Sequence, residues 1–384
     1  MKICLVTHYY DTHGGGVEIV ARHIAQELCS REDVAITWVA GDVDIPLEVN
    51  ARLKCVPVKV WNITENKLGI PYPFLSFGAL KKLSREIKAS DAVHIHDYLY
   101  PGNVFAFFRA RALGKPVIIT QHIGHIPYDN LFIRGLLTLF NKTLGRYILG
   151  HAGKTIFISE TVREYFFPSE NNINSCPVLI PNGVDLDVFS DVEEEEKRRI
   201  REKLMVDGGK PALLFVGRFV EKKGLSILEG LARRMSGVNW FFAGWGPLDP
   251  SSWGLKNVRV FYRADRDTVS SLYRVSDLLV LPSRGEGYPL VVQEAMASGT
   301  PAAVSDETAR AFTPAEVHLF HFPAVGENAL DVWADGLGRI LGDPEKLKAM
   351  RIDVKVFARR TWCWKKCAES YYSVLKDSID RRSR

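Results

Sequence analysis

The sequence has no long hydrophobic run: no uncharged stretch approaches the roughly 18 residues that a membrane-spanning helix needs. Cysteine is scarce, with six in 384 residues, and the six do not show the paired spacing of a redox motif or a zinc site. Cys363 and Cys367 would share one helix face, but two thiols make only half of a metal site. The apolar segment 1–7 is too short for the core of an export signal. We therefore expect a reduced cytoplasmic protein.

A large excess of one charge sign is also missing, because 50 basic residues stand against 45 acidic ones. Basic and aromatic residues do not interleave along one element, so we expect no nucleic-acid partner. The basic residues are nevertheless concentrated, since segment 51–154 holds 15 of them and only 5 acidic residues. Within 127–154, a Leu- and Phe-rich face accompanies Arg134, Lys142 and Arg146. Two interpretations stay open: an amphipathic helix in peripheral contact with the inner face of an anionic membrane, or a core helix whose cations reach solvent.

Short β-rich apolar runs alternate with longer segments of helical period, which predicts an α/β protein with parallel sheets covered by helices. The first series predicts strands at 2–8, 34–41, 92–96, 116–122 and 154–159, and helices at 17–29, 74–88, 102–113 and 130–149. The second series predicts strands at 212–217, 239–244, 258–261, 277–282 and 301–304, and helices at 225–235, 267–275, 290–298 and 327–341. The length and the two series together indicate two doubly wound domains.

Ligands of open parallel sheets bind at the carboxyl ends of the strands, so the strand-to-helix turns are the places to search. The first turn carries three consecutive glycines, Gly14, Gly15 and Gly16, directly before an amphipathic helix. Glycines let the backbone approach a phosphate or a sugar without interference from a Cβ atom. The turn matches neither the dinucleotide fingerprint nor a P-loop, so a phosphate-binding loop and an ordinary flexible turn both stay open.

Two further turns carry charged residues. Arg218 and Lys223 flank the turn after strand 212–217, where two cations near a helix N-terminus can clamp a diphosphate. Ordinary solvated cations of a loop are the competing interpretation. Glu286 and Glu294 lie eight residues apart, on the turn after strand 277–282 and on the next helix. Two such carboxylates can accept hydrogen bonds from the separate diols of a nucleotide sugar, and a general acid/base pair is the competing interpretation.

In combination these residues resemble a known family. Gly217-Arg218, Lys223-Gly224 and the segment 283–299 with its Glu-x7-Glu spacing are similar to the donor half of glycosyltransferase family 4, a retaining family with the GT-B fold. The resemblance implies two facing Rossmann-like domains, with a nucleoside-diphosphate sugar held mainly by the second and an acceptor glycan or glycolipid by the first. We accordingly expect domains at 1–185 and 186–360, and a C-terminal helix in 361–384 that crosses back to the first domain.

The resemblance also implies roles for single residues. Arg218 and Lys223 match the diphosphate-binding pair, Glu286 the carboxylate near the donor sugar, and Glu294 the carboxylate that binds the ribose hydroxyls. His122 matches a histidine that lines the cleft near the sugar, and the other histidines are expected to be packed or surface residues. The remaining donor-binding positions are Gly15, Gly16, Gly287, Tyr288 and Leu290. No cofactor and no metal is expected.

Two departures from the family pattern affect the prediction. Pro289 replaces a glycine and removes an amide donor from its turn, and segment 305–323 lacks the usual glycine-rich stretch and its following glutamate. They favour one alternative, a non-catalytic sugar-nucleotide-binding protein, while a GT-B epimerase or phosphorylase is the alternative among enzymes. The prediction is a metal-independent hexosyltransferase of polysaccharide or glycolipid biosynthesis that moves a sugar to an acceptor hydroxyl with retention.

Overall fold

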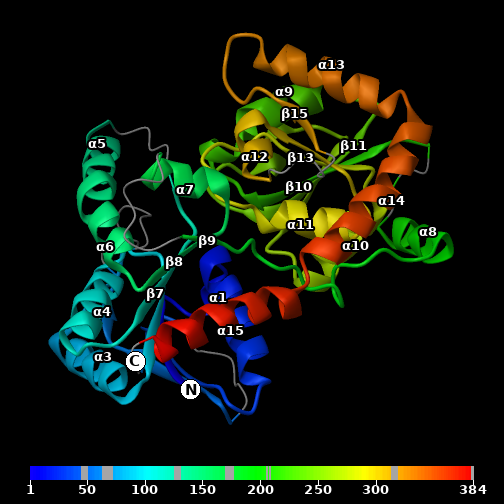
Figure 1. Cartoon of the computed structure of the whole chain (residues 1–384). Coiled ribbons are helices and arrows are strands. Elements are labelled where there is room, and N and C mark those ends of the chain that lie inside the picture. The colour runs from blue at the N-terminus through cyan, green and yellow to red at the C-terminus, as the bar shows by residue number, and fades with distance from the viewer. Residues whose placement is uncertain are drawn as a thin grey trace. The chain divides into compact units, whose positions relative to one another are not determined.

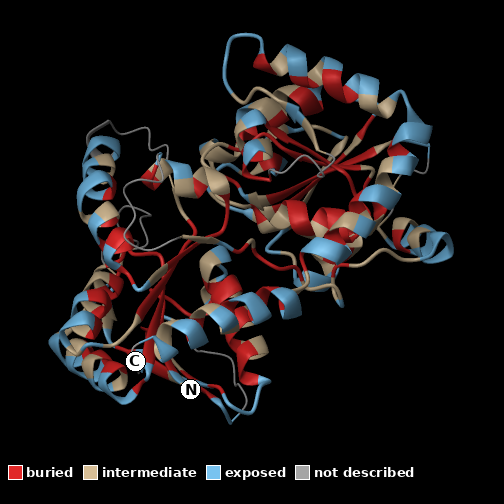
Figure 2. Cartoon of the chain, viewed as in Figure 1, coloured by how far each residue is buried: buried red, intermediate tan, exposed pale blue. Residues whose placement is uncertain are grey.

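The computed structural model describes residues 1–44, 51–62, 72–124, 131–168, 177–204, 206, 209–312 and 319–381. It divides into two compact units, Met1–Asn182 with Trp364–Arg384, and Gly183–Cys363 (Figure 1). The chain passes from one unit to the other at 182/183 and at 363/364, whereas the sequence predicts these boundaries at 185/186 and 360/361. Figure 2 shows that the central strands of each unit are buried while the outer faces of the helices are largely exposed.

The first unit contains a seven-stranded parallel sheet in the order β3-β2-β1-β6-β7-β8-β9. Its strands are β1 (Lys2–Val6), β2 (Ala35–Gly41), β3 (Leu53–Val58), β6 (Ala92–His96), β7 (Val117–Gln121), β8 (Lys154–Phe157) and β9 (Val178–Leu179), with a separate pair β4 (Val60–Trp61) and β5 (Phe74–Leu75). Its α-helices are α1 (Gly16–Cys29), α3 (Phe77–Ala89), α4 (Pro101–Ala112), α5 (Leu131–Phe140), α6 (Arg146–His151), α7 (Glu160–Phe166) and α15 (Trp364–Asp380). All residues of β6 and β7 are buried, as expected of strands covered on both faces.

The C-terminal helix α15 belongs to this first unit, although the chain reaches it from the second. It packs against α1 and contacts β6 and β7. Trp364, at the start of α15, stacks on His23 of α1 with ring centroids 4.8 Å apart, and Tyr371 is buried beside His94 of β6. Burial of these aromatic rings fixes α15 on the sheet.

The second unit contains a six-stranded parallel sheet in the order β12-β11-β10-β13-β14-β15. Its strands are β10 (Ala212–Arg218), β11 (Asn239–Trp245), β12 (Val258–Tyr262), β13 (Leu278–Leu281), β14 (Ala302–Ser305) and β15 (Phe320–Phe322). Its α-helices are α8 (Glu194–Lys203), α9 (Leu225–Arg234), α10 (Arg266–Val275), α11 (Leu290–Ala297), α12 (Asp306–Ala311), α13 (Ala329–Leu341) and α14 (Pro344–Thr361). Helix α9 packs with α13, α10 packs with α8 and α11, and α11 also packs with α14 (Figure 1).

The structure differs from the sequence prediction mainly at the sheet edges. Strands β3, β9 and β15 were not expected, because β3 contains Pro57 and the other two are only two and three residues long. The predicted helix 130–149 is interrupted by a π-helical turn, Asn141–Gly145. Segment 305–323, which departs from the family pattern, begins with the short helix α12, whose N-cap Ser305 accepts a hydrogen bond from the amide of Thr308.

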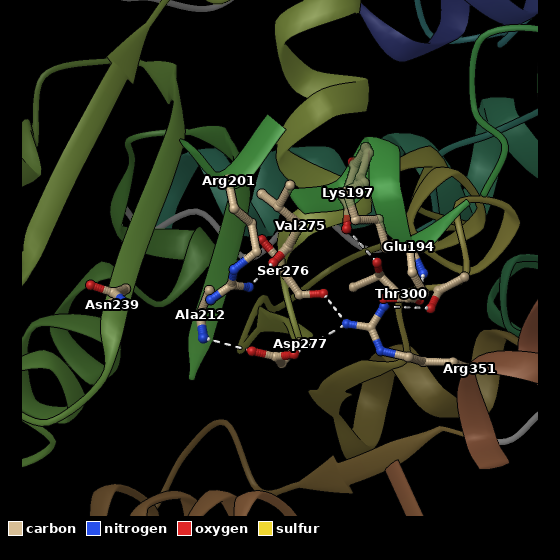
Figure 3. A network of polar contacts seen from close by, with 12 residues as sticks. Glu194, Lys197, Arg201, Ala212, Asn239, Val275, Ser276, Asp277, Thr300 and Arg351 are labelled. Atoms are coloured by element: carbon tan, nitrogen blue, oxygen red, sulfur yellow. Dashed lines mark hydrogen bonds and ion pairs between the residues drawn. The ribbon is translucent and has the colours of Figure 1, made fainter. Parts of the chain in front are cut away.

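A polar network holds the amino ends of β10 and β13 in place (Figure 3). Asp277 accepts a hydrogen bond from the amide of Ala212, the first residue of β10, at 2.8 Å. Arg351 of α14 donates to the carbonyl oxygen of Ser276 at 2.5 Å and to the Asp277 carboxylate at 3.3 Å. Arg201 of α8 donates to the carbonyl oxygen of Val275 at 2.8 Å. The network lies at the amino ends of these strands, whereas the strand-to-helix turns follow their carboxyl ends.

Candidate active site

The carboxyl end of β10 carries the first part of the candidate site. Arg218 is the exposed last residue of the strand, and Lys223 ends a short 3-10 turn, Glu221–Lys223. The next residue, Gly224, has φ +76°, and a Cβ atom there would lie 2.5 Å from the carbonyl oxygen of Pro282. The turn after β10 therefore packs directly on the turn after β13, and only glycine fits this position without strain.

An ion pair joins these two turns. Lys223 Nζ lies 2.5 Å from Glu286 Oε1, and the two side chains are only 16% and 12% exposed. Burial alone would raise the pKa of the Glu286 carboxyl, but the charges of Lys223 and Lys222 and the hydrogen bond from Lys223 outweigh it and hold the pKa below its usual value. The structure thus brings together two of the predicted site residues, with Glu286 ionised at neutral pH.

Lys222 adds a further cation that the sequence analysis did not select. Burial, together with the charges of Lys223 and Arg218, lowers the pKa of its amine, while Glu286 acts in the opposite direction. We call Arg218, Lys222 and Lys223 the cationic rim. Their three positive charges stand against the one negative charge of Glu286, so the rim has a net positive charge. Such a rim favours an anionic ligand.

Glu294 lies in the second turn of α11, where the sequence predicts it, and its partner is not Glu286 but Tyr273 of α10. The Tyr273 hydroxyl donates a hydrogen bond to Glu294 Oε2 at 3.0 Å. Burial raises the pKa of the Glu294 carboxyl to about 7, against the effects of Tyr273 and Arg266. The carboxyl is therefore held by α10 in a place where it can be neutral or charged near physiological pH.

The turn between β13 and α11 contains the other predicted donor residues. Its aromatic residue is packed inward, since the Tyr288 ring lies 4.3 Å from that of Phe312 and its hydroxyl accepts a hydrogen bond from Trp362 at 2.9 Å. Gly287 precedes it, Pro289 is the N-cap of α11, and Leu290 is the first residue of that helix. The ring of Tyr288 thus stabilises the turn from the inside.

The segment that departs from the family pattern also reaches this turn. Glu307 of α12 accepts a hydrogen bond from the amide of Gly285 at 3.1 Å, next to Glu286. Sequence reasoning missed Glu307, because the segment was read only for the glycine-rich stretch and the following glutamate that it lacks. A carboxylate three residues after the end of an apolar strand is the signal that could have revealed it.

In the first unit, the glycine turn after β1 is closed by a carboxylate. A Cβ atom on Gly15 would collide with the Glu18 carboxylate, whereas nothing lies within 4 Å of a Cβ atom on Gly16. Glu18 Oε1 lies 2.8 Å from His8 Nε2, and both side chains are buried. His8 also stacks on Tyr100 with ring centroids 3.6 Å apart. Glu18 and His8 were not predicted as site residues, although both border the glycine turn in sequence.

His122 lies in a buried polar cluster at the carboxyl ends of β6 and β7. Its Nε2 atom lies 2.9 Å from His96 Nδ1. Burial, and to a lesser degree the charge of His94, lowers the pKa of His122 to about 3, so the imidazole is neutral at physiological pH. Asp97 Oδ1 accepts hydrogen bonds from the amides of His122 and Ile123, and Asp97 adopts a left-handed φ of 59°. Sequence reasoning placed His96 among the packed residues and did not select Asp97.

The segment Asp185-Leu186-Asp187, a formal Asp-x-Asp motif, stabilises the loop before α8 and ties it to α10. Asp185 Oδ1 accepts a hydrogen bond from the amide of Asp187 at 3.2 Å, and Asp185 Oδ2 lies 2.9 Å from Arg266 Nη2. Within the described ranges, no group of three or more His, Cys, Asp or Glu side chains can hold a metal ion. None of the helices in these ranges has the length and hydropathy of a membrane span.

Two family models match the chain. The model described as Glycosyltransferase Family 4 matches residues 14–188, and the model described as Glycosyl transferases group 1 matches residues 196–353. The chain belongs to glycosyltransferase family 4. It is therefore a glycosyltransferase, as predicted from the turns of the second unit.

Individual proteins agree with this assignment. The N,N'-diacetylbacillosaminyl-diphospho-undecaprenol alpha-1,3-N-acetylgalactosaminyltransferase of Campylobacter jejuni is 26% identical over 314 residues, which cover 80% of this chain and 81% of that protein. Sucrose-phosphate synthase from Thermosynechococcus elongatus has a TM-score of 0.80 at 18% identity, covering 99% of this chain and 100% of the other. HepE of Anabaena in complex with UDP-glucose has a TM-score of 0.74 at 14% identity, covering 98% and 100%. The predicted GT-B fold class, with two Rossmann-like domains, is thereby confirmed.

Proposed function

We propose that this glycosyltransferase moves a sugar from a nucleoside-diphosphate sugar to a hydroxyl group of a glycan or glycolipid, with retention of configuration. The observation that carries the proposal is the cationic rim of the second unit, formed by Arg218, Lys222 and Lys223 around the ionised Glu286. HepE, which shares the fold, was solved with UDP-glucose, and this supports a nucleotide sugar as the donor.

The rim acts on the leaving group. When the bond between the anomeric carbon and the diphosphate breaks, negative charge develops on the departing phosphate oxygen. Arg218 can bind that phosphate through two N–H groups, and Lys223 can add a point charge. Glu286, held by Lys223, then directs its free carboxylate oxygen to the hydroxyls of the donor sugar. Gly15 and Gly16 of the first unit are proposed to approach the donor phosphate with their amides.

Glu294 is proposed to bind the ribose hydroxyls. Tyr273 occupies Glu294 Oε2, which leaves Oε1 to accept hydrogen bonds from the ribose. Hydrogen bonds of this kind are stronger to a charged carboxylate. Since burial raises the pKa of Glu294 to about 7, donor binding is expected to favour its ionised form and to release a proton below that pH.

Retention is proposed to use attack from the face that the diphosphate leaves. The acceptor hydroxyl then gives its proton to the departing phosphate oxygen, so no protein base is needed at that step. His122 is neutral, and we propose that it lines the donor-sugar site as a hydrogen-bonding group rather than as a cation.

A surface of the first unit suits a lipid-linked acceptor. We call it the α5–α6 patch: Leu136, Leu139, Phe140 and Tyr147 are exposed there, beside the exposed cations Arg134 and Lys142. No acidic residue occurs from 130 to 159. Exposed rings and leucines between cations are suited to the interface of an anionic membrane. The Campylobacter relative, whose named substrate carries diphospho-undecaprenol, supports an acceptor of this class. Residues 125–130 and the side chains of 131–133 lie outside the described part.

The donor proposal is tested by thermal shift with a panel of UDP-, GDP- and ADP-sugars, because a ligand that binds the folded state raises the melting temperature. One nucleotide class should raise it, and the matching nucleoside should not. Slow hydrolysis of that donor, followed by proton NMR, should first release the sugar as the same anomer as in the donor. Release of the opposite anomer would disprove retention.

The membrane proposal is tested by sedimentation with phosphatidylcholine vesicles, with and without phosphatidylglycerol. The wild type should sediment only with the anionic vesicles, and Leu139→Ser with Phe140→Ser should abolish this. The matched control is Ile352→Ser with Val356→Ser, which removes two equally exposed apolar side chains from α14. Equal binding by all three proteins would contradict the proposal.

A further inference from the structure

Three residues at the carboxyl ends of neighbouring strands form an unusual contact in the second unit. Arg218 ends β10 and Trp245 ends β11, and the two are partners in the register of the parallel pair. Arg263 directly follows β12. The guanidinium carbons of Arg218 and Arg263 lie 4.8 Å and 5.5 Å from the centroid of the Trp245 ring. One indole thus contacts two arginines.

The backbone fixes this arrangement. Phe219 donates its amide to the carbonyl oxygen of Trp245 at 2.7 Å, and Arg263 donates its amide to that of Gly244 at 2.9 Å. A Cβ atom on Gly246 would lie 2.5 Å from the carbonyl oxygen of Phe219. The loop after β11 can therefore approach β10 this closely only because residue 246 is glycine. The backbone at Trp245 is consequently fixed next to Arg218 and Arg263, and the residue is 36% exposed.

Arg263 adopts a backbone conformation that does not suit it. Its φ is +50°, and among the described residues only Asp97 shares such a left-handed φ without being glycine. A long side chain is disfavoured there, and glycine would satisfy the backbone better. Non-glycine residues in this region concentrate at functional sites, where the side chain is needed in a particular position.

Both arginines also lack a counter-charge. No carboxylate in the described part of the chain forms an ion pair with Arg218 or Arg263, and both side chains are exposed. A guanidinium that lies over an aromatic ring keeps its N–H groups free at the edge of its plane. These edges are the groups that bind phosphate in a bidentate manner.

We propose that Trp245 and Arg263 are donor-positioning residues: Trp245 fixes the plane of the Arg218 guanidinium, and Arg263 adds a second unpaired cation to the site that receives the donor's diphosphate. The proposal rests on the proposed function and extends it beyond Arg218 and Lys223. It explains why the left-handed position after β12 is occupied by arginine and why an exposed tryptophan ends β11.

The test uses the full chain and isothermal titration calorimetry with UDP, GDP and ADP, and with the matching nucleosides. Arg263→Gly should weaken binding of the preferred nucleoside diphosphate about tenfold or more, since a charge-assisted hydrogen bond is lost. Trp245→Leu should weaken it about two- to fivefold, and Trp245→Phe should retain it. Binding of the nucleoside should not change. Because glycine relieves the backbone at 263, the melting temperature of Arg263→Gly should equal or exceed that of the wild type.

The control is Arg259→Ala, which removes another arginine of β12, whose guanidinium carbon lies 5.3 Å from the Phe261 ring centroid. It should leave nucleotide binding unchanged. If Lys223→Met weakens binding and Arg263→Gly stays within twofold of the wild type, this inference is overturned while the proposed function stands. If the wild type binds no nucleoside diphosphate, both are overturned.

Discussion

Lys223 Nζ and Glu286 Oε1 lie 2.5 Å apart, although their residues are 63 positions apart in the sequence. The pair joins the turn after β10 to the turn after β13, which are neighbouring strands. A lysine and a glutamate that are both proposed to bind the donor thereby hold each other in place. The same contact serves the fold and the proposed chemistry, and the two contributions can be separated by mutation.

Lys223→Met should lower the free energy of unfolding by about 2 kcal/mol, because Glu286 is left largely buried without its partner. The double variant with Glu286→Gln should recover most of this loss, since no charge then stays unpaired. Urea unfolding of the four proteins measures the cycle. Donor binding should not recover in the double variant. Additive losses of stability would show that the two residues do not interact.

Gly224→Ala should lower the free energy of unfolding by about 2 kcal/mol or more, because alanine is strained at φ +76° and its Cβ atom would meet the carbonyl oxygen of Pro282. The two turns should then separate, and donor binding should weaken with stability. Gly237→Ala is the control, since nothing lies within 4 Å of a Cβ atom there and its φ is not positive. Thermal unfolding checks both variants. Equal changes of stability in Gly224→Ala and Gly237→Ala would contradict the close packing of the two turns.

The raised pKa of Glu294 predicts a pH-dependent contribution to stability. Below about pH 4.5 the carboxyl is protonated in both states; as pH rises, the unfolded chain ionises first, and the folded state follows only near pH 7. The contribution of Glu294 is therefore present at low pH and lost between pH 4.5 and 7. Glu294→Gln keeps an acceptor for Tyr273 and lacks this loss, so its stability relative to the wild type should grow with pH, by up to about 3 kcal/mol. A constant difference from pH 4.5 to 8 would contradict the assigned pKa.

Gly15→Ala should displace the Glu18 carboxylate from His8 and cost about 1 kcal/mol. Gly16→Ala should be neutral or slightly stabilising, because its Cβ atom meets no neighbour and alanine favours the helix. Combining Gly15→Ala with Glu18→Ala should remove the collision and leave only the cost of Glu18→Ala itself. Chemical unfolding compares the variants. A larger loss for Gly16→Ala than for Gly15→Ala would show that Glu18 does not close this turn.

Central strands could be predicted from the sequence because burial on both faces leaves continuous apolar runs. Strand β6 has the predicted bounds Ala92–His96, and β10 is only one residue longer than predicted. The edge strands could not be predicted in this way. Strand β3 contains Pro57, and β15 has only three residues, so their pairing depends on neighbours distant in the sequence.

The candidate site shows the same division. Single turns could be found from the sequence, because glycines and charges follow apolar strands at Gly15, Arg218 and Glu286. Contacts between turns could not, because the sequence does not show that Glu307 reaches Gly285 or that Trp245 lies beside Arg218. These contacts depend on the strand order and register of the sheet.

The most direct test of the account is a calorimetric comparison of the wild type with the double variant Arg218→Met, Lys223→Met, using the preferred nucleoside diphosphate and its nucleoside. We expect the affinity of the double variant for the nucleoside diphosphate to fall by a factor of about 100 or more, while its affinity for the nucleoside stays the same. Arg351→Ala, which breaks the network at the opposite sheet edge, should keep both affinities. Undiminished binding of the diphosphate compound by the double variant would contradict the claim that this rim holds the donor.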